Sequence, residues 1–60
     1  MQLKKTEQTL QDQMQDRVFA AMETGNAGQA RTLLREYRVI DEVGAQEIRT
    51  AVIDSFGYAI

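Results

Sequence analysis

The segment Met22-Glu23-Thr24-Gly25-Asn26 separates two helical patterns and sets the topology of this chain. Gly25 can adopt the left-handed backbone conformation that closes a helix. Asn26 can cap the next helix by accepting a hydrogen bond through its side-chain oxygen. A helix-stop signal therefore stands directly before a helix-start signal, between two segments with helical periodicity. We expect residues 6–38 to form an αα-hairpin.

Apolar residues recur at helical spacing over three segments, at about 4–23, 27–38 and 42–55, and an apolar tail follows at 56–60. The expected apolar faces are formed by Leu3, Leu10, Met14, Val18, Ala21 and Met22 in the first segment, by Ala30, Leu33, Leu34 and Tyr37 in the second, and by Ala45, Ile48, Val52, Ser55 and Phe56 in the third. Asp41 is the expected N-cap of the third helix, and Gly57 is expected to end it. The β-branched pair Val39-Ile40 is interpreted as a short extended link. The predicted class is all-α, with the third helix packed across the hairpin.

The size of the chain predicts a partner. A protein of 60 residues forms one domain, and a domain this small buries only about 60% of the surface that its unfolded chain exposes. Disulfides, a metal or a second chain usually supply the missing stability. The sequence contains no Cys and no His, which excludes disulfides and the commonest transition-metal ligands. A partner chain, identical or not, is therefore expected, and a homodimer is the leading form.

The same composition argues against enzymatic activity and against a cofactor or metal site. Without His or Cys, the usual nucleophile–base pairs cannot form, and no Gly-rich phosphate loop follows a predicted strand. The carboxylate pairs Asp12/Asp16 and Asp41/Glu42 are interpreted as solvated residues. We predict no enzymatic activity, no cofactor and no metal. No apolar run approaches the ~20 residues that span a bilayer, so no membrane association is expected, and the lack of Cys favours the cytoplasm.

Three arginines on the predicted helix 27–38 form a pattern that indicates a binding function. Arg31, Arg35 and Arg38 follow i, i+4, i+7 spacing and lie within about 60° of one another around a helix. Three interpretations stay open. The arginines can simply keep this face soluble, they can pair with carboxylates, or they can contact nucleic-acid phosphate. The net charge of −2 disfavours nucleic acid, whose binding depends on many basic contacts. Carboxylates of a second copy, on the acidic stripe formed by Asp12, Asp16 and Glu23, are the favoured charged partner.

Three apolar features do not fit a three-helix monomer. Phe19 lies about 145° from the centre of the first apolar face, so it either anchors a partner or packs under the tail. Val43 and Ile53 lie opposite Ile48 and Val52 on the third helix, which predicts a second apolar face buried by a neighbour. In the tail, apolar side chains alternate as in a strand, and three interpretations stay open: the tail docks on a partner, folds back onto its own core, or acts as a degradation signal. The alternating residues are Phe56, Tyr58 and Ile60.

The sequence thus favours a small non-enzymatic helical protein that acts by binding protein, with itself as one partner. Short acidic chains of this kind are typical of phage, plasmid or bacterial regulators. The partner-binding candidates are Phe19, Arg31, Arg35, Arg38, Val43, Ile53, Phe56, Tyr58 and Ile60. A DNA-binding regulator that uses the arginine stripe is one alternative, and a structural subunit of a larger assembly is the other.

Overall fold

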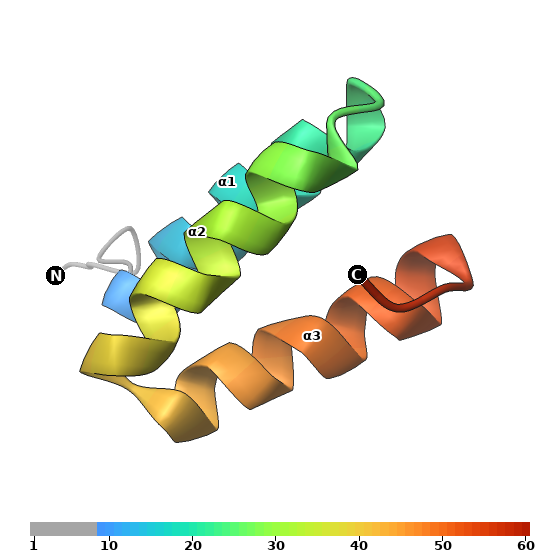
Figure 1. Ribbon diagram of the computed structural model, residues 1–60. Helices are drawn as coiled ribbons and strands as arrows, with labels where there is room; N and C mark the ends of the chain where they lie inside the picture. Colours follow the sequence, from blue (N-terminus) through green and yellow to red (C-terminus); the bar gives the residue numbers. More distant parts are fainter. Residues whose placement is uncertain (1–8) are drawn as a thin grey trace, which may run out of the picture.

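Three helices make up the fold. The computed structural model describes residues 9–60, which contain α1 (Leu10–Glu23), α2 (Ala27–Ile40) and α3 (Glu42–Phe56), and no strand occurs in this part of the chain. Figure 1 shows α1 and α2 side by side, while α3 leaves the end of α2 at an angle and the last residues turn back toward the other helices. Each helix contacts both others. The predicted all-α class is confirmed.

The connection between α1 and α2 follows from residues 22–26. Gly25 has a φ of 82°, and its N–H donates to the Met22 carbonyl at 3.1 Å. The Asn26 N–H reaches back to the Ala21 carbonyl at 2.8 Å, which completes a Schellman motif. The Asn26 side chain then accepts from the Gln29 N–H at 3.1 Å and caps α2. Both predicted roles, the glycine stop and the asparagine cap, are confirmed.

Two predicted helix boundaries were wrong. α1 begins at Leu10 and not at about residue 4, because Thr9 is extended and its hydroxyl accepts from the Asp12 N–H as the N-cap; residues 4–8 lie outside the described part. The Val39-Ile40 pair is not an extended link, because α2 continues to Ile40. Asp41 alone separates α2 from α3. Its N–H closes α2 on the Tyr37 carbonyl at 2.8 Å.

The Asp41 side chain links α2 to α3. Its Oδ1 accepts from the Gly44 N–H at 3.0 Å, which makes it the N-cap of α3 as predicted. Its Oδ2 accepts from the Tyr37 hydroxyl at 3.1 Å. Burial of the ring, this hydrogen bond and the charge of Asp41 raise the pKa of Tyr37 above its ordinary value of 10.0. A single carboxylate therefore caps α3 and satisfies a buried phenol.

The core lies where the three helices meet. Its buried side chains are Val18, Ala21, Met22, Ala30, Leu34, Tyr37, Ala45, Ile48 and Val52. All of them belong to the predicted apolar faces, although Leu10 is exposed and Leu3 lies outside the described residues. Gly57 ends α3 with a φ of 87°, also as predicted.

Phe19 packs inside the chain. Its ring meets the ring of Phe56 edge-on, with centroids 5.3 Å apart, and both side chains border the core. The predicted apolar face of the first helix was too narrow, because α1 contacts both α2 and α3 and so buries a wider arc than one neighbour would cover. The tail also folds back, since Ile60 packs against the core.

Candidate functional site

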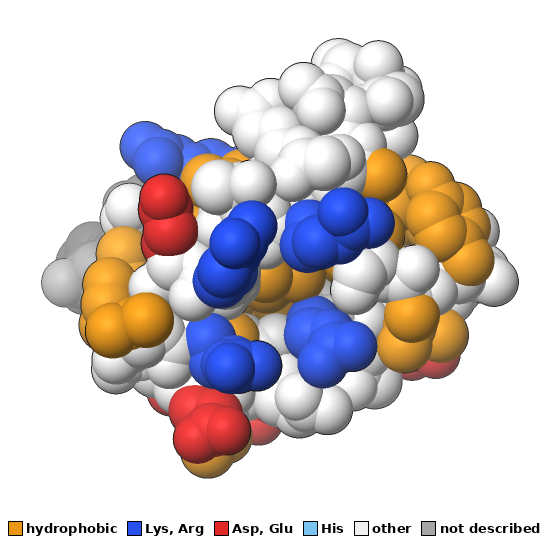
Figure 2. All heavy atoms as spheres, in the orientation of Figure 1, with side chains coloured by type: hydrophobic (Ala, Val, Ile, Leu, Met, Phe, Trp, Pro, Cys, Tyr) orange, Lys and Arg blue, Asp and Glu red, His pale blue; other side chains and the backbone are white. Residues whose placement is uncertain are grey.

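Four arginines surround a hollow between α2 and α3. Arg31, Arg35 and Arg38 line it from α2, as their spacing predicted, and Arg49 lines it from α3. Figure 2 shows these side chains as a blue ring around a small apolar area. The hollow has a volume of about 350 Å³. We call it the arginine hollow.

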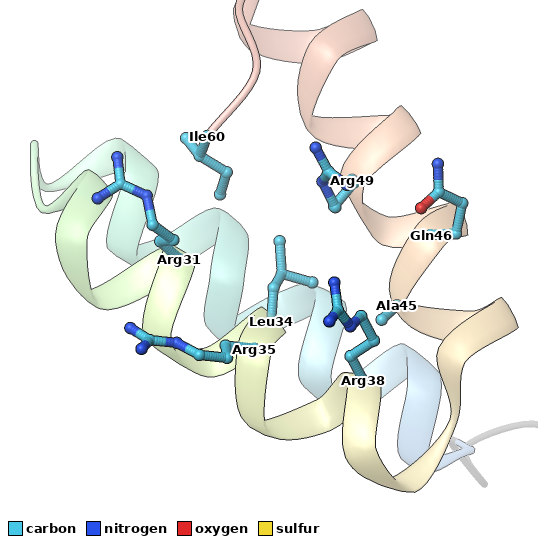
Figure 3. A pocket seen from close by; sticks show the side chains of 8 residues that line it. All are labelled: Arg31, Leu34, Arg35, Arg38, Ala45, Gln46, Arg49 and Ile60. Carbon is cyan, nitrogen blue, oxygen red and sulfur yellow. The ribbon is translucent and has the colours of Figure 1, made fainter.

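The floor of the arginine hollow is apolar. Leu34 and Ala45 are 5% and 1% exposed and form its base together with Ile60. Figure 3 shows the side chains of Leu34 and Ile60 directed into the space between the helices, with the guanidinium groups around them. Gln46 adds a polar amide at the rim. The hollow therefore offers a hydrophobic base inside a ring of positive charge.

The positive charge of the ring is not neutralised by the described part of the chain. Within residues 9–60, none of the four arginines forms an ion pair or a side-chain hydrogen bond. Like charges one turn apart on a helix cost a few tenths of a kcal/mol, so this arrangement does not stabilise α2. Since the net charge of the chain is −2, four positive charges on one face leave −6 for the remainder. The charge distribution is strongly asymmetric.

Sequence reasoning missed Arg49. It follows Ile48 and lies one turn beyond Ala45, so it borders the buried face of α3. That position in the sequence could have indicated that Arg49 lies beside a neighbouring helix. Periodicity within α2 cannot show that an arginine of α3 joins the stripe. The meeting depends on how α3 packs against α2, which no local pattern encodes.

The other predicted partner-binding residues separate into two groups. Phe19, Phe56 and Ile60 pack against the core of the chain itself. Val43, Ile53 and Tyr58 are exposed, at 70%, 43% and 53%. Val43 lies on the outer face of α3, away from the buried Ile48 and Val52. The two faces of α3 therefore differ: one is core, and the other is open to a neighbour.

The described residues contain no candidate metal centre. No three acidic, His or Cys side chains gather there as a metal cluster would require. The acidic residues of α1 that were predicted to face a partner, Asp12 and Glu23, are exposed. Across residues 9–60, every helix is too short or too polar to cross a bilayer. The chemistry that the site offers is recognition of anionic groups beside an apolar surface.

Comparisons of this chain with protein-family models, with curated proteins and with solved structures find no match. The arginine hollow and the exposed apolar side chains are therefore the features that indicate the function.

Proposed function

We propose that this chain is a small, non-enzymatic regulatory protein of the cytoplasm that binds an acidic segment of a protein partner in the arginine hollow. The observation that carries the proposal is the ring of four arginines around an apolar floor, without a carboxylate partner in the described part of the chain. Guanidinium groups bind carboxylates through paired hydrogen bonds. Leu34 and Ala45 at the base favour a ligand that also brings an apolar side chain.

The proposal includes the oligomeric state and the role of the helices. α1 and α2 act as an αα-hairpin scaffold that holds the arginine stripe rigid, and the chain works as a homodimer. Three observations support a dimer: the small size of the domain, the lack of cysteine and the exposed apolar residues Val43 and Ile53 on the outer face of α3. Interfaces of this kind combine buried apolar anchors with arginine.

A DNA-binding regulator is the second candidate. Arg49 favours it, because it adds a fourth guanidinium group to the three that α2 presents on this face. Two observations weigh against it. The apolar floor has no counterpart on a phosphate backbone, and the acidic remainder of the chain repels a polyanion.

Fluorescence anisotropy with two labelled probes tests the proposal. One probe is a synthetic helical peptide with a leucine stripe flanked by glutamates, and the other is duplex DNA of mixed sequence. The parent should bind the peptide and not the DNA at physiological salt. Changing Arg31, Arg35, Arg38 and Arg49 to Gln should abolish peptide binding and leave the helical circular dichroism signal intact, because exposed charges contribute only about 0–1 kcal/mol each to folding.

The matched control is Arg17→Gln, which removes one exposed arginine of α1 outside the hollow. This variant should bind the peptide like the parent. A glutamine peptide of the same length and leucine pattern should bind weakly, because the ring would lose its carboxylate partners. Tight binding of the DNA by the parent, or peptide binding that survives removal of all four arginines, would reject the proposal.

A further inference from the structure

The junction of α2 and α3 exposes a second surface, and its chemistry complements the arginine hollow. Val39, Ile40 and Val43 are 87%, 70% and 70% exposed and are the most exposed large apolar residues of the described chain. Glu36 precedes Ile40 by one helical turn, and Glu42 directly precedes Val43; both are exposed. We call these five residues the acidic corner. Figure 2 shows apolar and acidic side chains at the lower left, beside the blue arginines.

We infer that the acidic corner of a second copy of this chain occupies the arginine hollow. This inference rests on the proposed function and names the partner at that site. The corner presents apolar side chains with two carboxylates beside them, and the hollow presents an apolar floor inside a ring of guanidinium groups. Each surface therefore supplies what the other lacks. The most exposed apolar side chains of the described residues become buried in the same step.

The positions of the two surfaces allow a closed dimer. Arg38 lines the hollow and directly precedes Val39 of the corner, so the two surfaces adjoin at the end of α2. A two-fold axis at their shared edge places each corner in the hollow of the other copy. Such an interface is isologous and closes with two copies, so no edge remains for further addition.

The acidic stripe of α1 is a weaker match for the hollow. Asp12 and Glu23 are exposed, but the aromatic residue on that side of α1, Phe19, is engaged with Phe56. The stripe therefore offers charge without an accessible apolar anchor for the floor. The acidic corner offers both, which is why it is the preferred occupant.

Charge reversal with mixing tests the inference. One variant carries Arg35→Glu and Arg49→Glu in the hollow, and the other carries Glu36→Arg and Glu42→Arg in the corner. Each variant alone places like charges opposite each other at both contacts of the dimer and should be a monomer. The mixture pairs opposite charges at both contacts, so a heterodimer should form. Native mass spectrometry separates the two homodimers from the heterodimer by mass.

A second, milder pair of variants shows whether a loss of dimerisation is caused by unfolding. Val39→Ser removes an apolar group that is 87% exposed and should leave the fold intact, yet it should weaken dimerisation about tenfold or more if Val39 is buried by the second copy. Leu10→Ser, at 51% exposure at the start of α1 and outside both surfaces, is the matched control and should leave the dimer unchanged. Circular dichroism checks that every variant retains its helices.

Every outcome of these experiments either supports or overturns the proposed self-association. Rescue by mixing, with Val39→Ser weakened, supports the inference. Dimers of both charge-reversed variants alone, or no heterodimer on mixing, overturn it. A parent that stays monomeric in sedimentation equilibrium at high micromolar concentration also overturns it. The peptide competes with the second copy for the same hollow, so its binding is measured at protein concentrations at which the parent is monomeric; failure of the self-association then does not imply failure of the proposed function.

Discussion

Replacing Gly44 by Ala should destabilise this protein, although the same change stabilises most helices. Alanine is favoured over glycine inside a helix by about 0.8–1.0 kcal/mol. At Gly44, however, an added Cβ would overlap the Asp41 carboxylate, lying 2.9 Å from its Cγ, and would come within 3.0 Å of Gln11 Oε1. The Gln11 side chain is long, and its amide donates to Glu47 Oε1 at 2.8 Å; because that bond is exposed to water, a shift of the Gln11 side chain costs little. The Asp41 carboxylate cannot shift without loss, because it caps α3 and holds the Tyr37 hydroxyl.

The magnitude follows from the two hydrogen bonds at risk. Losing the N-cap costs about 1 kcal/mol, and losing a hydrogen bond to a charged group costs about 1.5–3 kcal/mol. Subtracting the helix propensity of alanine leaves a net destabilisation of about 2 kcal/mol. In a domain of this size, each 1 kcal/mol lowers the melting temperature by about 4–8 °C. Gly44→Ala should therefore melt roughly 10 °C below the parent.

Gly28→Ala is the matched control. It also places alanine at a helical glycine, but the added Cβ would meet only Asn26 Oδ1, at an ordinary contact distance of 3.9 Å. This variant should be more stable than the parent by about 0.5 kcal/mol. Urea and thermal unfolding followed by circular dichroism measure both changes, at one fixed protein concentration because association shifts apparent stability.

A double-mutant cycle isolates the cause. Asp41→Ser keeps a short capping hydroxyl and removes the carboxylate that the new Cβ would overlap. In that background the cost of Gly44→Ala should largely disappear, and the difference between the two costs measures the coupling. The reasoning is refuted if Gly44→Ala is as stable as the parent, or if its cost is the same with and without the Asp41 carboxylate.

Four further substitutions test other parts of the structure. Leu34→Ala should cost about 2–5 kcal/mol in the free energy of unfolding, because Leu34 is 5% exposed in the core; a melting temperature near that of the parent would contradict this. Asn26→Ala should cost about 1 kcal/mol through the lost cap, and Gly25→Val should cost more, because valine resists the φ of 82° found there. Because the pKa of Tyr37 is raised in the folded state, its contribution to stability is present below pH 10 and is lost as the pH rises further. In a pH series of urea unfolding, Tyr37→Phe should show a smaller alkaline loss than the parent; equal losses would exclude Tyr37 as the cause.

Features that act within one or two helical turns were predictable from the amino-acid sequence. Gly25 and Asn26 specify the turn between α1 and α2, Asp41 specifies the start of α3, and Gly57 specifies its end, because each acts on backbone groups only a few residues away. The i, i+4, i+7 spacing also placed Arg31, Arg35 and Arg38 on one face of α2, since a helix has a fixed period. These predictions needed no knowledge of the neighbouring helices.

Only the tertiary structure decided which surfaces meet. Arg49 joins the arginines of α2, and Phe19 meets Phe56, because α3 packs against both α1 and α2 at a particular angle. The end of α2 stays helical through Val39 and Ile40, where the sequence alone indicated an extended link, because a single residue, Asp41, is enough to turn the chain into α3. The residues of each of these contacts come from different helices. Their distance is set by the packing of whole helices, which the periodicity of one helix does not contain.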